Sequence, residues 1–244
     1  MRRTARRKRP RRCSTRFWAN GPLRLTSPAG IVAAGGRGER AGAAGELPKQ
    51  FRLLGGRTLL EWSVDLLAAA GCNPIVVVLP LDVDASHAPG GVVVRPGGTS
   101  RQASVWSGLQ SVESDRVVIH DGARPFASPT LVHRTVDALS HHDGAVAAVP
   151  LDETLKLVSG EDVVSTIDRS GLWSIQTPQA FHTATLRRAH ESALSDDITA
   201  TDDAALVERY GGRVCVVRGA RTNIKLTYAE DFELAEALFR GGAR

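Results

Sequence analysis

The segment from Ile31 to Phe51, IVAAGGRGERAGAAGELPKQF, joins a short apolar run to a glycine-rich turn and to a lysine that follows a proline. The apolar run predicts a buried strand, and the glycines after it allow a tight turn in which backbone amides bind anions. Arg37, Arg40 and Lys49 add positive charge to the same loop. The segment therefore predicts a phosphate-binding loop, with ordinary chain punctuation as the alternative.

The length and the distribution of charge limit the class of protein. The 244 residues suit one α/β domain and are few for two large ones. Residues 1–24 hold 10 of the 31 Lys and Arg residues and no acid, which leaves 21 basic against 26 acidic residues elsewhere. We therefore expect residues 1–28 to form a disordered basic extension: a dispensable tail, a nucleic-acid-binding arm, a targeting segment or translation upstream of the true start.

Cysteine usage and hydropathy indicate the compartment. Cys13, Cys72 and Cys215 are odd in number and widely spaced, which fits a reducing environment and neither a disulfide framework nor a zinc site. No apolar run approaches the length of a membrane span, and the N-terminus lacks the apolar core of a secretory signal. The sequence thus predicts a cytoplasmic protein without a membrane partner.

Strand and helix patterns alternate along residues 29–244. Strands are predicted at residues 31–34, 74–79, 92–95, 116–120, 145–149 and 213–217. Helices are predicted after the capping boxes at 58–61 and 227–230, at 100–112, 128–142 and 184–194, and behind Thr201. This order is typical of an α/β fold with a mostly parallel twisted sheet and helices on both faces. Ligands then bind where strands end, at the loops 35–49, 96–101 and 121–125.

Residues 151–171 interrupt this alternation. They contain two short β-like pieces around the turn Ser159-Gly160-Glu161-Asp162. A two-stranded ribbon is marginal alone and usually packs on something. We therefore predict a protruding β-arm that reaches a second subunit.

Three further residues are candidates for chemistry. Asp121 follows an apolar strand, where a carboxylate can hold Mg²⁺ against a triphosphate, although Asp-Gly is also an ordinary turn. Arg124, three residues on, suits bidentate binding of phosphate. Lys225 lies in a mainly apolar segment before a helix, where a lysine either extends its amine to solvent or serves a charged ligand.

Eight motifs in order resemble the 2-C-methyl-D-erythritol 4-phosphate cytidylyltransferases, members of the sugar-phosphate nucleotidyltransferases, from Gly30 to the C-terminus. They are Ala34-Gly35-Gly36-Arg37-Gly38-Glu39-Arg40, Pro48-Lys49-Gln50-Phe51, Gly97-Gly98 to Ser104, His120-Asp121-Gly122-Ala123-Arg124-Pro125, Asp168-Arg169-Ser170-Gly171-Leu172-Trp173, Gln176-Thr177-Pro178-Gln179, Thr201-Asp202-Asp203 and Asn223-Ile224-Lys225. The resemblance implies a Rossmann-like nucleotidyltransferase fold and a homodimer. It also implies Mg²⁺-dependent transfer of CMP from CTP to methylerythritol phosphate in non-mevalonate isoprenoid synthesis.

The resemblance also implies roles for individual residues. The catalytic set is Arg40, Lys49 and Lys225, and the nucleotide-binding set is Ala34, Gly35, Gly36, Gly38, Gly98, Thr99 and Ser104. The acceptor-binding set is Asp121, Arg124, Thr154, Arg169 and Thr177, with Asp121 also the metal ligand and with Thr154 and Arg169 supplied by the neighbouring subunit.

Two alternatives stay open at this point. A ribitol 5-phosphate cytidylyltransferase shares the P-K-Q-F loop and the D-x-x-R-P turn, but the motif at residues 168–173 favours the erythritol enzyme. A nucleic-acid-binding module that uses the arginine-rich tail is the alternative from another class, and its binding would weaken steeply with salt.

Overall fold

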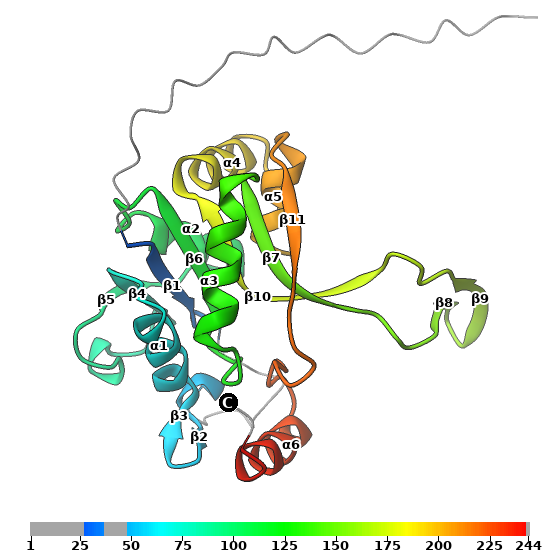
Figure 1. Ribbon diagram of the computed structural model, residues 1–244, viewed down its shortest axis with the longest axis horizontal. Coiled ribbons are helices and arrows are strands. Elements are labelled where there is room, and N and C mark those ends of the chain that lie inside the picture. Colours follow the sequence, from blue (N-terminus) through cyan, green and yellow to red (C-terminus); the bar gives the residue numbers. More distant parts are fainter. Residues whose placement is uncertain (1–26, 37–47, 243–244) are drawn as a thin grey trace, which may run out of the picture.

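The computed structural model describes residues 27–36 and 48–242, and its centre is a seven-stranded sheet (Figure 1). The strand order is β11-β7-β10-β6-β1-β4-β5, and all neighbours pair in parallel except β10, which is antiparallel to both β6 and β7. The strands are β1 (Ala29–Ala33), β4 (Ile75–Leu79), β5 (Val93–Pro96), β6 (Arg116–Asp121), β7 (Gly144–Pro150), β10 (Trp173–His182) and β11 (Val214–Arg218). The predicted mostly parallel α/β fold is confirmed.

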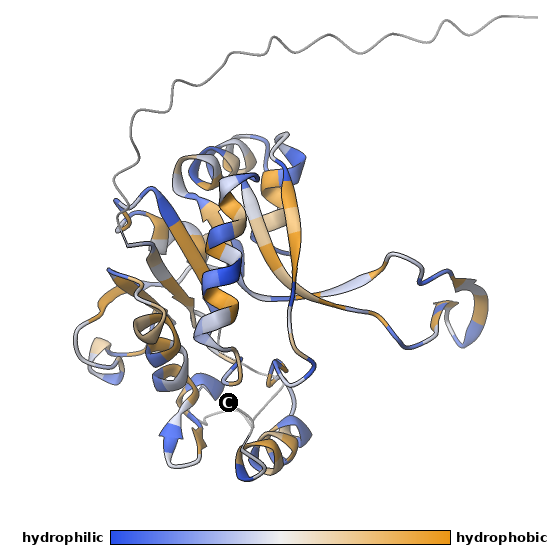
Figure 2. Ribbon diagram, in the orientation of Figure 1, coloured by the Kyte–Doolittle hydropathy of each residue, from blue (hydrophilic) through white to orange (hydrophobic). Residues whose placement is uncertain are grey.

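Helices cover both faces of this sheet. They are α1 (Leu59–Ala69), α2 (Arg101–Leu109), α3 (Pro129–Asp137), α4 (Thr183–Ser195) and α5 (Asp203–Arg209). The described residues also form helix α6 (Ala229–Arg240), which lies apart from the main sheet, and the short 3-10 turns η1 (Lys49–Phe51), η2 (Ala85–His87) and η3 (Ala138–Ser140). Figure 2 shows strands of the main sheet largely in the hydrophobic colour, whereas the helices around it carry both colours. The helices therefore present one apolar side to the sheet and one polar side to water.

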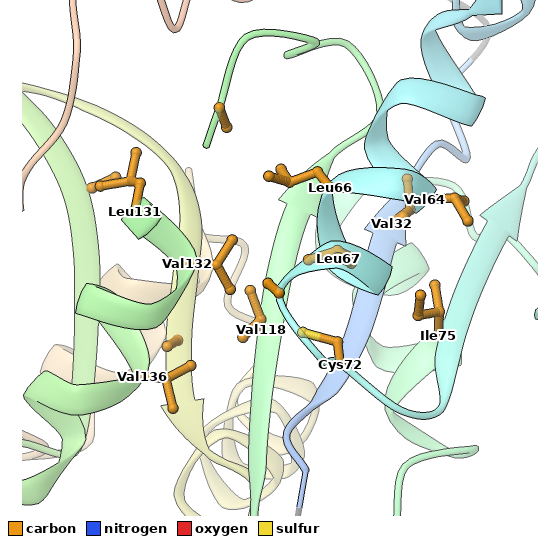
Figure 3. Close-up of a cluster of buried hydrophobic side chains, with 14 of the residues drawn as sticks. Val32, Val64, Leu66, Leu67, Cys72, Ile75, Val118, Leu131, Val132 and Val136 are labelled. Carbon is orange, nitrogen blue, oxygen red and sulfur yellow. The ribbon is translucent and has the colours of Figure 1, made fainter. Parts of the chain in front are cut away.

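The alternation of side chains along the strands divides the core in two. In β1, Ile31 packs in one cluster with residues of α2, α4 and α5, while its neighbour Val32 packs in the other with α1 and α3. The second cluster is drawn in Figure 3, where Leu67 of α1 and Val132 of α3 lie over Val118 of β6. Strands buried on both faces are apolar throughout, which is why the sequence predicted them well.

The central strand β10 has no counterpart among the predicted strands. Its residues Gln176, Thr177 and Gln179 are polar but at most 6% exposed, and Pro178 interrupts them. The register with β7 shifts between Ile175 and Gln179. An apolar or alternating pattern cannot reveal a strand whose polar side chains are buried, and in this sheet those side chains line the candidate site.

The predicted arm at residues 151–171 projects from the sheet as the connection between β7 and β10 (Figure 1). It ends in the antiparallel pair β8 (Leu155–Ser159) and β9 (Asp162–Ile167), joined by a turn in which Gly160 has a φ of 61°. Its apolar side chains are exposed; Val163 and Val164, for example, are each 59% exposed. The protrusion is confirmed, and the single chain leaves the apolar side chains of the arm in water.

A small C-terminal unit completes the fold. Helix α6 packs against the hairpin of β2 (Leu53–Leu54) and β3 (Arg57–Thr58) around a third apolar cluster. The capping box at 58–61 is confirmed, but the one at 227–230 is wrong by one residue. The carboxylate of Asp231 accepts from the amides of Tyr228 and Thr227, so the helix begins at Ala229. None of the helices in the described residues is both long and apolar enough to cross a membrane.

Candidate active site

Asp121 is the centre of a cluster of charged side chains at the carboxyl edge of the main sheet. It is the last residue of β6 and only 5% exposed. Arg101 Nε lies 3.2 Å from Asp121 Oδ1, and Lys225 Nζ lies 2.8 Å from Oδ2. Arg124 Nε lies 3.7 Å from the same Oδ2. Cations from α2, from the turn after β6 and from the segment before α6 thus surround one buried carboxylate.

These cations fix the protonation state of Asp121. Burial alone would raise the pKa of this carboxyl, but Arg101, Lys225 and Arg124 outweigh burial and hold the pKa well below its usual range. Asp121 is therefore ionised at neutral pH. A carboxylate that binds protons so weakly suits the binding and orientation of cations and does not suit general-base catalysis.

Arg101 is held between two buried carboxylates. Its Nη1 lies 2.6 Å from Oδ2 of Asp203, the first residue of α5, and Asp203 Oδ1 lies 3.1 Å from His190 Nε2 on α4. Burial would raise the pKa of Asp203, but Arg101 and the hydrogen bond with His190 lower it on balance. Neither Arg101 nor Asp203 is a candidate from the sequence alone, where the only signal is their place in the third and seventh motifs.

The segment that carries Lys225 is fixed to β10 and to the turn after β6. Asn223 Nδ2 donates to the carbonyl of Thr177 at 2.9 Å and to Gln176 Oε1 at 3.2 Å. Arg124 Nη1 donates to the carbonyl of Asn223 at 2.7 Å. These contacts place Lys225 beside Asp121, and they explain why a polar asparagine is completely buried.

The short helix η1 contacts both the segment that carries Lys225 and the turn after β1. Lys49 Nζ donates to the carbonyl of Leu226 at 2.8 Å, so Lys49 reaches the backbone next to Lys225. Gln50 Nε2 donates to the carbonyls of Ala34 at 2.7 Å and Gly36 at 3.2 Å. The predicted Lys49 and Lys225, distant in sequence, are therefore brought to one edge of the sheet.

The two glycine turns pack against each other. A Cβ atom on Gly35 would lie 2.7 Å from Ser104 Oγ, and one on Gly97 would lie 2.9 Å from the carbonyl of Leu79. Ser104 Oγ accepts from the amide of Gly98 at 3.1 Å and donates to the carbonyl of Ser100 at 2.9 Å. Glycine is required here by close approach, and the predicted Gly35, Gly98 and Ser104 lie together.

His120 also belongs to this region, although it is not among the predicted site residues. It is completely buried, with Nδ1 at 3.2 Å from Thr177 Oγ1 and Nε2 at 3.0 Å from the carbonyl of Arg124. Burial lowers its pKa to about 4, so the imidazole is neutral at pH 7. The sequence signal for it is its position directly before Asp121 in the fourth motif.

A cavity of about 530 Å³ opens beside the charged cluster. Its lining combines charged and polar side chains of the cluster and of β10 with apolar ones of β7, α5 and β11. The residues are Arg101, Asp121, Arg124, Val146, Ile175, Gln176, Thr177, Gln179, Thr201, Asp202, Ala204, Ala205, Glu208, Val214, Cys215, Val216 and Lys225. The predicted Asp121, Arg124, Thr177 and Lys225 thus share one cavity.

Three other predicted residues, Thr99, Thr154 and Arg169, are exposed and do not line this cavity. Thr154 and Arg169 are exposed at the end of the β8–β9 pair that is opposite its turn, and neither is among the described residues that line the cavity. Thr99 is exposed in the loop before α2. Gly38 and Arg40 lie outside the residues that the structure describes.

The fold and the site define an α/β protein of the nucleotidyltransferase class, with glycine turns and clustered cations at the carboxyl edge of a mostly parallel sheet. The family model of 2-C-methyl-D-erythritol 4-phosphate cytidylyltransferase matches residues 29–241. The chain belongs to this family.

Individual members of this family match most of the chain. The 2-C-methyl-D-erythritol 4-phosphate cytidylyltransferase of Geobacillus thermodenitrificans is 41% identical over 218 residues, which are 85% of this chain and 95% of that enzyme. The bifunctional IspD/IspF enzyme of Rhodospirillum rubrum is also 41% identical, over 89% of this chain but only 58% of its own length. The crystal structure of the cytidylyltransferase from Thermus thermophilus superposes with a TM-score of 0.77 at 36% identity, covering 88% of this chain and all of that one.

Proposed function

We propose that this protein transfers CMP from CTP to the phosphate of 2-C-methyl-D-erythritol 4-phosphate and releases pyrophosphate. An oxygen of the acceptor phosphate forms a bond to the α-phosphorus of CTP, and the bond from that phosphorus to the β-phosphate oxygen breaks. The observation that carries the proposal is the cluster of Arg101, Arg124 and Lys225 around Asp121, beside two glycine turns. The product serves non-mevalonate isoprenoid precursor synthesis.

The chemistry of the acceptor explains which side chains are present. A phosphate is already a nucleophile, so the enzyme needs neither a nucleophile of its own nor a strong base. Catalysis reduces to alignment of the two reactants and neutralisation of charge at the α-phosphorus. We assign neutralisation to Lys49, Arg40 and Lys225, and phosphate binding on the acceptor side to Arg124.

We place the nucleotide along the two glycine turns. Backbone amides of Gly35 and Gly36, at the end of β1, face the triphosphate in this proposal, as oriented amides bind phosphate elsewhere. The loop with Gly98 and Thr99 and the start of α2 with Ser104 contact the cytosine. The close packing of these turns leaves backbone, and few side chains, to meet the ligand.

The carboxylate of Asp121 suits a magnesium ion that binds together with the nucleotide. No group of three or more His, Cys, Asp or Glu side chains in the described part of the chain is placed to hold a metal ion. Mg²⁺ is commonly bound by one or two carboxylates together with substrate phosphates, and Asp121 provides one carboxylate at the correct edge. The ion would neutralise charge on the phosphates.

Metal removal tests this assignment. EDTA is expected to abolish CMP transfer, and excess Mg²⁺ to restore it, whereas the melting temperature of the protein without nucleotide stays unchanged because this assignment places the ion in the nucleotide complex. Both readouts come from the same preparation, by pyrophosphate release and by calorimetry. A clear drop in melting temperature with EDTA would show a resident ion and contradict the assignment.

We propose further that the functional unit is a homodimer and that the arm completes the site of the partner. The arm exposes apolar side chains, including Leu157, Val158, Val163 and Val164, which a second subunit would cover. Thr154 and Arg169 flank the β8–β9 pair, away from the cavity of their own chain. From there they would bind methylerythritol phosphate in the neighbouring subunit.

The choice of acceptor is tested directly. The protein is incubated with CTP, Mg²⁺ and either methylerythritol phosphate or ribitol 5-phosphate, and the products are identified by mass spectrometry. We expect 4-diphosphocytidyl-2-C-methyl-D-erythritol as the main product. Faster turnover of ribitol 5-phosphate would overturn the proposal, and transfer to neither acceptor would remove the activity altogether.

A further inference from the structure

His120 is a completely buried polar side chain that contacts residues of the candidate site but has no part in the proposed reaction. Its ring lies between the carbonyl of Arg124, 3.0 Å from Nε2, and the hydroxyl of Thr177, 3.2 Å from Nδ1. The Thr177 oxygen also accepts from the backbone amide of Asp121 at 3.0 Å. His120 is thus linked to both ends of the turn from Asp121 to Arg124.

The contact with Arg124 determines the hydrogen on one ring nitrogen, and the tautomer then determines the role of the other. A carbonyl oxygen only accepts, so Nε2 of His120 must carry the hydrogen that it shares with Arg124. In the neutral ring Nδ1 is then an acceptor, and Thr177 must donate its hydroxyl hydrogen to it. The Thr177 oxygen is left as the acceptor for the Asp121 amide. The result is a directional chain from Asp121 through Thr177 to the ring, and a second bond from the ring to Arg124.

We propose that His120 is a positioning residue for CMP transfer: its contacts with the Thr177 hydroxyl and the Arg124 carbonyl tie the two ends of the turn together, and thereby fix the backbone from which Asp121 and Arg124 project. This inference rests on the proposed roles of Asp121 and Arg124. The turn also has backbone supports: the amide of Gly122 donates to the carbonyl of Ala33 at 3.2 Å, that of Arg124 to Asp121 at 3.1 Å, and that of Leu226 to Ala123 at 2.9 Å. His120 adds to them a side chain that joins the two ends of the turn.

Packing alone is the competing explanation, and the two make different predictions. A buried ring that only fills space affects stability, whereas a ring that sets the direction of two site residues affects turnover. Small misplacement of a catalytic group can lower the rate about 10²-fold. The loss of turnover in His120 variants, compared with their loss of stability, therefore decides between the two explanations.

Conservative variants separate the two hydrogen bonds. The His120→Gln side chain has an N–H near the position of Nε2 but no acceptor near Nδ1, and the His120→Asn side chain has an acceptor near Nδ1 but does not reach Arg124. Each is expected to lower kcat about 10-fold, with KM for CTP within about 2-fold of wild type. Thr177→Val also removes the acceptor of the Asp121 amide, so it should lower kcat at least as much as His120→Gln, while Thr177→Ser keeps the hydroxyl and most of kcat.

A double-variant cycle tests the link. Both His120→Gln and Thr177→Val remove the hydrogen bond between these two side chains, so the double variant should lose about as much as Thr177→Val alone, not the product of both. The control is His182→Gln, because His182 Nε2 also contacts a carbonyl, that of Leu139 at 3.0 Å, on the far side of the fold from Asp121. It should lower the melting temperature and leave kcat within about 2-fold.

The ring state is measured independently in wild-type protein. Long-range ¹H–¹⁵N correlation spectra of the imidazole, assigned to His120 through its backbone, are expected to show a hydrogen on Nε2. A ring without a hydrogen on Nε2 would overturn the inference, as would His120 variants that lose stability but keep kcat. Asp121→Asn distinguishes the two proposals: if it remains fully active, the site assignment and this inference both fail. If it is inactive while the His120 variants keep kcat, this inference alone fails.

Discussion

The Lys225→Ala variant is expected to lose CMP transfer about 10²-fold or more in turnover, equivalent to about 2.7 kcal/mol of transition-state stabilisation, with little change in melting temperature. Lys225 Nζ lies 2.8 Å from Asp121 Oδ2, but its side chain is 41% exposed, so it contributes little to the core. Its position between the buried carboxylate and open solvent is that of a cation that meets a charged ligand. The loss is measured as pyrophosphate release at saturating CTP.

Arg57 provides a matched control for this variant. Its side chain is also 41% exposed, and its Nη1 lies 2.5 Å from Asp65 Oδ2, outside the candidate site. Exposed ion pairs contribute little to stability, so Arg57→Ala should keep turnover within about 2-fold of wild type and the melting temperature nearly unchanged. If Lys225→Ala behaves like Arg57→Ala, then Lys225 does not act on the transition state.

The sequence predicted those strands whose buried side chains are apolar. Strands β1, β4 and β6 are apolar on both sides because helices cover both faces, and their sequences stand out as short apolar runs. The antiparallel β10 did not stand out, because its buried residues Gln176, Thr177 and Gln179 are polar and form hydrogen bonds in the interior. No periodicity rule recognises a polar strand of this kind.

The candidate site also contains some residues that the sequence could predict and some that it could not. Asp121 could be predicted because it follows an apolar strand, and the glycines because a turn needs them. Arg101 and Asp203 could not be, because their contact joins residues 102 positions apart on two different helices. The direction of an arginine side chain depends on which carboxylates the fold brings to it, and that is decided by tertiary packing.

Mixing two inactive variants is expected to restore about a quarter of wild-type activity if the arm completes the partner's site. Lys49→Ala damages the nucleotide side of its own chain, and Arg169→Ala damages the acceptor side of the neighbouring chain. Each alone should lose about 10²-fold in turnover. Random exchange of subunits gives heterodimers as half of all dimers. Each heterodimer contains one doubly damaged site and one intact site.

The experiment requires proof of exchange and a control for restored folding. Differently tagged variants are mixed, and heterodimers are purified by tandem affinity and counted by native mass spectrometry. Purified heterodimers should show about half the wild-type activity per dimer, while Arg169→Ala homodimers should still bind CTP because Lys49 and both glycine turns are intact. Heterodimers without activity would place Arg169 in the site of its own chain. Since Arg169 does not line the cavity there, such a result would require the arm to fold back onto its own subunit.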